Sequence, residues 1–293
     1  MVARLFLTPD DLHPGRQRLR AGWRILGQMV IMTLIALAVA LVFNLFSLLT
    51  TMFTSYGLFV AQIGTFIAIN SSIFLARRWL DRRSMVSLGL DIGRQSARDL
   101  LAGFLIAGAI MMVIYFILRA AGWLTFQGFA WQRVSPLDTF LATLVMFGLF
   151  VIVGWQEELL SRGYQLQNIA EGLNIVWGVV LSSLLFALGH LSNPNMAAPA
   201  GVGLFLAGLF LAYAFLRTRR LWLPIGLHIG WNFFEGVVLG FPVSGLNLFR
   251  LIEQSVEGPV LFTGGAFGPE AGLVLLPALA LGTILVYYYT RLE

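Results

Sequence analysis

Long apolar runs separated by short polar segments dominate the chain. About eight of them approach the roughly 20 residues that cross about 30 Å of hydrocarbon as an α-helix. They cover residues 25–51, 56–76, 100–118, 137–155, 173–190, 200–216, 221–240 and 271–289. The pattern predicts an all-α, polytopic membrane helix bundle of about eight transmembrane helices. It consists of a cytoplasmic N-terminal segment, 1–24, and a single multi-span membrane domain, 25–293.

The first apolar run follows several arginines and contains an alanine-rich stretch, as the region around a signal-peptide cleavage site does. The run is longer than the apolar part of a typical signal peptide, and it continues well beyond any small-residue cleavage site. We therefore expect an uncleaved membrane anchor.

Composition supports a membrane protein and excludes two other classes. The chain is 58% hydrophobic and 11% charged, whereas soluble proteins average roughly 25% charged residues. So many apolar residues exclude intrinsic disorder as well as an ordinary soluble globule. They must face a lipid bilayer in addition to a protein core. Without cysteine, the chain has neither a disulfide framework nor a thiolate nucleophile.

The arginines give the expected orientation. The net charge is +5, and all 19 basic residues are arginine. With a cytoplasmic N-terminus, all but three of them lie on the inner side, and the exceptions are Arg119, Arg133 and Arg250. This is the positive-inside pattern, which together with an even number of spans predicts two cytoplasmic termini. Orientation in a bacterial inner membrane thus explains the basic pI without nucleic acid as a partner.

Small residues at four-residue spacing predict close helix contacts in lipid, at Gly103 with Ala107 and at Gly203 with Ala207. The longest connections are 77–99, which is basic, and 241–270, which is rich in glycine and proline and is expected outside.

Ionisable residues interrupt the end of the fourth apolar run. Each costs on the order of 2.5 to 3.5 kcal/mol at the centre of a membrane helix, so each needs an explanation. Glu158 and Arg162 are four residues apart and can form an ion pair on one helix face. Glu157 projects about 100° away from them. A solvated helix end with a stop at Gly163 explains the cluster equally well.

Two further runs carry polar side chains. The fifth closes with Phe186 and His190, and a lone histidine at a helix end often simply bonds to a carbonyl. In the seventh, His228, Asn232 and Glu235 stand at i, i+4 and i+7 and share one face. Burying such a stripe is costly unless it meets polar partners.

Together these groups have the inventory of a hydrolase. A carboxylate, two imidazoles and an amide can supply a general base and hydrogen-bond donors for an oxyanion. The same groups can hold zinc, for which two histidines and a glutamate are a common ligand set. The H-E-x-x-H motif of zinc proteases is absent from the chain.

Three short motifs resemble the signatures of the CPBP intramembrane proteases, also called the Abi family, which includes CAAX proteases and bacteriocin-processing or immunity proteins. They follow in the family's order: Glu157-Glu158-x-x-x-Arg162, Phe186-x-x-x-His190 and His228-x-x-x-Asn232. The resemblance is concentrated in residues 154–232, within an expected core of 137–240.

The resemblance implies an intramembrane endopeptidase. Glu157, assisted by His190, would activate a water for attack on a peptide carbonyl, and His228 and Asn232 would stabilise the oxyanion. Glu158 and Arg162 would hold the site structurally, and we place Glu235 with them as a supporting residue. The substrate is expected to be a peptide or protein in or near the membrane.

The family includes enzymes described as metalloproteases and enzymes described as metal-independent glutamate proteases. If a divalent metal such as zinc is bound, Glu157, His190 and His228 are its expected ligands. The sequence leaves both mechanisms open.

Two other functions remain open. A transporter or channel also places Glu, His and Arg inside the membrane, but the chain shows no matching halves of the kind that transporters often contain. The other is a non-catalytic scaffold or immunity protein. One geometric difficulty accompanies the protease hypothesis. A straight fifth helix would carry His190 about 25 Å from the end where Glu157 lies. Convergence therefore requires a displaced helix, a re-entrant segment at 163–172 or a deep polar cavity.

Overall fold

The computed structural model describes residues 6–10, 17–49 and 57–291. Two of the arginines counted on the inner side, Arg4 and Arg16, lie outside the described residues. The chain packs into two compact units. The first unit comprises Met1–Asp91 and Gln156–Ser182, and the second comprises Ile92–Trp155 and Ser183–Glu293.

The predicted all-α, polytopic class is confirmed. Among the described residues, five helical runs are long and apolar enough to cross a membrane: Ala21–Asn44, Phe59–Asp81, Arg94–Ala120, Pro136–Gly172 and Ala198–Thr218. The other three expected spans form shorter helices. These are α8 (Ile175–Gly189), α10 (Trp222–Asn232) and α12 (Leu275–Arg291).

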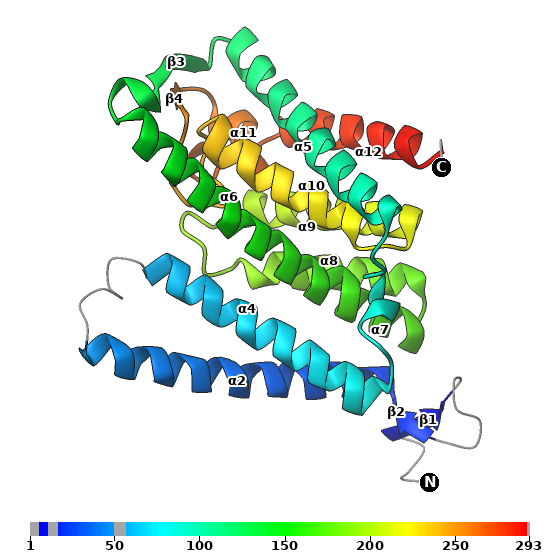
Figure 1. Cartoon of the computed structure of the whole chain (residues 1–293). Coiled ribbons are helices and arrows are strands. Elements are labelled where there is room, and N and C mark those ends of the chain that lie inside the picture. The colour runs from blue at the N-terminus through cyan, green and yellow to red at the C-terminus, as the bar shows by residue number, and fades with distance from the viewer. Residues whose placement is uncertain (1–5, 11–16, 50–56, 292–293) are drawn as a thin grey trace. The chain divides into compact units, whose positions relative to one another are not determined.

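The first unit is built on two long helices that lie side by side, α2 (Ala21–Leu49) and α4 (Gly57–Ala76) (Figure 1). A short antiparallel pair, β1 (Leu7–Pro9) and β2 (Gln17–Leu19), precedes α2. The π-helix η1 (Arg77–Asp81) and the 3-10 turn η2 (Val86–Leu88) follow α4. Across the helix pair, the buried amide of Gln28 donates to Ser72 at 2.9 Å.

The fourth expected span does not stop at Gly163. Helix α6 (Pro136–Glu158) continues as the π-helix η4 (Leu159–Gln165) and then as α7 (Leu166–Gly172). Gly163 is buried within η4, so the interpretation as a solvated helix end is wrong. Residues 163–172 are helical throughout. A π-helix inside a longer helix is often found at functional sites.

In the second unit, α5 (Arg94–Ala120) packs along α10 with its backbone close to that of α10. A Cβ atom at Gly226 would lie 2.1 Å from the carbonyl oxygen of Leu100, and one at Gly103 would lie 2.4 Å from that of Leu223. Only glycine fits at such separations. The predicted close helix contact at Gly103 is therefore confirmed. Helix α9 (Ala198–Thr218) and the π-helix η5 (Phe233–Val238), which extends α10, belong to the same unit.

Much of the connection 241–270 is buried in the second unit. It pairs β4 (Ile252–Val256) with β3 (Leu124–Phe129) and then forms α11 (Val260–Thr263), η6 (Gly265–Phe267) and η7 (Pro269–Ala271). The smaller turn η3 (Ala130–Gln132) follows β3. A Cβ atom at Gly203 would lie 1.8 Å from the carbonyl oxygen of Glu270. The close contact at Gly203 thus includes this connection, whereas the sequence suggested a neighbouring helix.

Candidate active site

The first motif forms a buried ion pair in the first unit. Arg162 donates through Nη1 to Oε1 of Glu158 at 2.8 Å, and both side chains are fully buried. This confirms the predicted pairing of residues four apart. The junction of α6 and η4 places both groups inside protein, where each offsets the desolvation cost of the other.

Glu157 stands one residue earlier and is half-buried. Because consecutive helical residues are about 100° apart, its carboxylate leaves the helix in a different direction from that of Glu158. Its other neighbour, Gln156, donates to the side chain of Gln62 on α4 at 2.9 Å. The flanking side chains are therefore held by the first unit, and Glu157 is the more accessible carboxylate of the two.

The second unit brings two histidines onto one aromatic ring. Phe186 on α8 lies 4.9 Å from His190 between ring centroids, and 5.9 Å from His228 on α10 in an edge-to-face arrangement. His228 and Phe186 are buried, whereas His190 is half-buried just after α8 ends. The second and third motifs thus meet in space, although 38 residues separate the histidines in sequence.

One hydrogen bond orients His190. Its Nδ1 lies 2.8 Å from the carbonyl oxygen of Phe186. Because a carbonyl only accepts hydrogen bonds, Nδ1 is the donor, and in the neutral ring Nε2 is then the nitrogen that can accept a proton. The carbonyl bond expected of an ordinary helix-end histidine is therefore present. It also prepares the opposite nitrogen for acid–base chemistry.

The predicted polar stripe on the seventh run is buried. His228, Asn232 and Glu235 are 6%, 7% and 0% exposed. Helix α10 ends at Asn232 and the chain continues as the wider π-helix η5, so Glu235 follows a different helical repeat from the other two. The indole N–H of Trp231 faces the Glu235 carboxylate from one turn earlier.

Glu270 is a buried carboxylate that sequence reasoning missed. Its Oε2 accepts hydrogen bonds from the backbone N–H of Ser244 at 2.8 Å and from the Ser244 hydroxyl at 2.7 Å. Burial raises the pKa of Glu270, while these bonds and the charges of His190 and His228 lower it, and burial prevails. This buried acidic group of the second unit therefore interacts electrostatically with both histidines.

The glycines that precede Glu270 in the sequence could have indicated that this segment is packed against others. Gly264, Gly265 and Gly268 all have positive φ, and such backbone allows close approach to other segments. A Cβ atom at Gly268 would lie 2.2 Å from the carbonyl oxygen of Pro242 and 3.6 Å from Oε1 of Glu235. With Gly272, four glycines lie within nine residues and fit a closely packed segment. The same pattern also fits a flexible loop.

Metal ligation was the remaining expectation for this site. Across the part of the chain that the structure describes, no three His, Asp or Glu side chains are arranged to hold a metal ion. Ligation of a divalent metal by Glu157, His190 and His228 stays a prediction of the sequence.

Comparison with known proteins matches the motif-bearing region. A family model described as "Type II CAAX prenyl endopeptidase Rce1-like" matches residues 139–234, which contain all three motifs. The chain is also similar to "Putative membrane peptidase YdiL" of Bacillus subtilis (strain 168), with 26% identity over 209 residues. That alignment covers 69% of this chain and 79% of the relative. No solved structure matches the chain.

Proposed function

We propose that this multi-pass membrane protein, whose CPBP-type resemblance is confirmed by the Rce1-like match, is an intramembrane endopeptidase. Its substrate is a peptide or protein in or at the edge of the bilayer. The observation that carries the proposal is the packing of His190 and His228 against the same ring of Phe186. A transport or scaffold role does not require the two motif histidines to converge in this way.

In the proposed reaction, Glu157 of the first unit and the histidines of the second act on one substrate. The Glu157 carboxylate accepts a proton from a water molecule, whose oxygen then bonds to the carbonyl carbon of the scissile peptide. The half-buried state of Glu157 suits this role because water and substrate must reach it. Glu158, neutralised by Arg162, stays outside the reaction and fixes the helix that bears Glu157.

The second unit supplies the groups that receive the developing charge. His228 and the Asn232 amide, one turn apart on α10, donate hydrogen bonds to the oxyanion of the tetrahedral intermediate. When this intermediate collapses, the C–N bond breaks and the leaving amine takes up the proton that came from water. His190 assists that transfer through Nε2, the nitrogen that its bond to Phe186 leaves for acid–base chemistry.

We propose that the reaction takes place in a bacterial inner membrane. The arginine distribution predicts cytoplasmic N- and C-termini. With this orientation, the motif-bearing end of α6 lies on the cytoplasmic side. The substrate is then a segment that reaches this side of the bilayer.

The test begins with the substrate. Membranes of cells that carry the intact protein are compared with membranes of cells that carry Glu157→Gln, and truncated products are identified by mass spectrometry. Products should appear only with the intact protein. Glu257→Gln, which changes an exposed loop carboxylate of the second unit, is the matched control and should leave the products unchanged.

The identified substrate is then incubated with purified protein in lipid nanodiscs. Glu157→Gln should lower the cleavage rate by about 10² to 10⁴, the usual contribution of a positioned general base. His228→Ala should lower it through loss of oxyanion stabilisation. Cleavage by folded Glu157→Gln at the rate of the intact protein would refute the proposed role of Glu157.

A further inference from the structure

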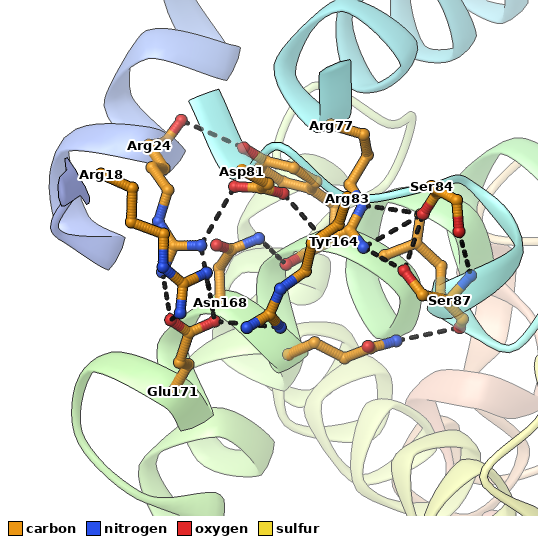
Figure 2. Close-up of polar contacts among 12 residues, drawn as sticks. Arg18, Arg24, Arg77, Asp81, Arg83, Ser84, Ser87, Tyr164, Asn168 and Glu171 are labelled. Carbon is orange, nitrogen blue, oxygen red and sulfur yellow. Dashed lines mark hydrogen bonds and ion pairs between the residues drawn. The ribbon is translucent and has the colours of Figure 1, made fainter. Parts of the chain in front are cut away.

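A charged cluster joins the start of α2 to the end of α4 in the first unit (Figure 2). Glu171 on α7 accepts hydrogen bonds from Arg24 at 2.9 Å and from Arg18 at 3.4 Å, and it forms an ion pair with Arg83 at 3.5 Å. Asp81 binds Arg24 at 3.2 Å and Arg77 at 2.9 Å. Four guanidinium groups therefore meet two carboxylates, and a surplus of positive charge remains.

Some guanidinium donors in this cluster have no acceptor. The Nε atoms of Arg24 and Arg83 are buried without a hydrogen-bond partner. Arg24 is only 1% exposed, whereas the side chain of Arg83 is 26% exposed. A buried unsatisfied donor costs free energy. A phosphate group presents several charged acceptor oxygens and matches guanidinium geometry. The cluster thus has the charge and the spare donors that suit a phosphate, and Arg83 is the member that solvent reaches.

An apolar groove runs along the same two helices. It has a volume of about 610 Å³. Its lining is almost entirely apolar, and small residues line its exposed margin, namely Ala36, Ala40 and Ala61. Leu160 of η4 also belongs to the lining. Hydrocarbon chains are the chemistry that such a surface accommodates in a membrane.

The groove and the cluster are close enough for one molecule to occupy both. Met32, at the near end of the groove, lies eight residues after Arg24, and Ile69 lies eight residues before Arg77. At 1.5 Å per residue, either separation is about 12 Å. One leaflet of a bilayer is about 15 Å of hydrocarbon. A phospholipid with its phosphate at the arginines can therefore extend an acyl chain into the groove.

We propose that the first unit binds one anionic phospholipid, with its phosphate at Arg24 and Arg83 and an acyl chain between α2 and α4. The charge surplus favours an anionic headgroup over a zwitterionic one. The predicted cytoplasmic side of this end is also the side on which basic segments meet anionic lipids. This site uses none of the residues assigned to peptide hydrolysis. The test of lipid binding is therefore independent of the test of the proposed protease function.

The headgroup is tested with neighbouring arginines. Full-length protein in detergent is titrated with phosphatidylglycerol or phosphatidylcholine, and bound lipid is counted by native mass spectrometry. The intact protein should bind one phosphatidylglycerol in preference to phosphatidylcholine. Arg83→Gln should reduce this preference about fivefold, as expected for loss of one arginine near an anionic headgroup. Arg82→Gln is the matched control, since Arg82 bonds instead to the carbonyl oxygen of Gln17 at 3.3 Å.

The groove is tested with two alanines of α2. Ala36→Phe places a ring in the groove and should reduce binding of both lipids, whereas Ala38→Phe, also exposed on α2 but outside the lining, should not. Equal thermal unfolding temperatures establish that all four variants fold. Absence of lipid preference in the intact protein, or equal effects within either matched pair, would overturn the proposal.

Discussion

Glu157 and Glu158 are adjacent in sequence, yet their surroundings give them opposite chemical properties. Glu158 is fully buried against Arg162 at 2.8 Å, so its charge is committed to holding the helix junction. Glu157 is half-buried and can meet water. In the second unit, His190 and Glu270 are likewise oriented by backbone and hydroxyl partners, the carbonyl of Phe186 and both donors of Ser244. Individual environments thus separate the reactive groups from the supporting ones.

Substitution of the two glutamates should therefore change the free energy of unfolding by different amounts. Glu158→Ala leaves a buried arginine without its carboxylate and should lower the free energy of unfolding by about 3–5 kcal/mol. Glu157→Ala should lower it by less than about 1 kcal/mol, because a partly exposed side chain loses little on truncation. Thermal unfolding in detergent, followed by tryptophan fluorescence, compares them. Equal destabilisation would contradict the division of roles.

Glu270 predicts a pH dependence of stability. Because burial raises its pKa in the fold, folding disfavours the ionised form, and the free energy of unfolding should fall as pH rises from the ordinary glutamate pKa of about 4.3 through the raised value. Glu270→Gln has no such proton to lose. The stability of the intact protein relative to Glu270→Gln should therefore be greatest in acid and decrease as pH rises through the raised pKa. A relative stability that increases with pH would show that burial does not control this carboxyl.

At the scale of elements, π-helices adjoin the ends of the motif-bearing helices. Helix α6 passes into η4 after Glu158, and α10 passes into η5 after Asn232. A sequence pattern based on 3.6 residues per turn predicts that the helix ends at Gly163. The helical run in fact continues to Gly172. The wider turns bury Arg162 and Glu235 while the helix continues, because the extra residue is absorbed without ending the hydrogen-bonded run.

Helix α10 is short, and its position depends on close contact with α5. Gly226 and Gly230, which flank His228, both face the α5 backbone. Gly226→Ala would place a Cβ atom 2.1 Å from the carbonyl oxygen of Leu100. Forcing the helices apart should destabilise the protein by about 1–3 kcal/mol and displace His228, with loss of cleavage.

The matched substitution is Gly148→Ala on the exposed face of α6, where a Cβ atom has nothing within 4 Å. It should leave stability unchanged or raise it by up to about 1 kcal/mol. Thermal unfolding and cleavage measured on both variants check this prediction. A stable, active Gly226→Ala would contradict the role given to the α5–α10 contact.

At the scale of the whole molecule, hydropathy predicted the fold class, and motif order pointed to the histidines that meet in the second unit. Five apolar helical runs and the meeting of His190 with His228 at Phe186 agree with those predictions. Glu270 lies 35 residues beyond Glu235, and only the folding of that connection brings the two acids into electrostatic contact. Such contacts arise from tertiary packing, which no local pattern encodes. The lipid groove likewise depends on how α2 and α4 pair.

The proposed hydrolysis requires Glu157 to act on the same peptide bond as His190 and His228. The chain contains no cysteine, so the double variant Glu157→Cys, His228→Cys carries one thiol pair. A general base acts in contact or through one water, so the two Cα atoms should lie within about 12 Å. A short bifunctional thiol reagent should therefore cross-link this pair in membranes, and should not link Glu157→Cys to Glu257→Cys. Failure of the first pair to cross-link, with both thiols labelled separately, would contradict a single hydrolytic site.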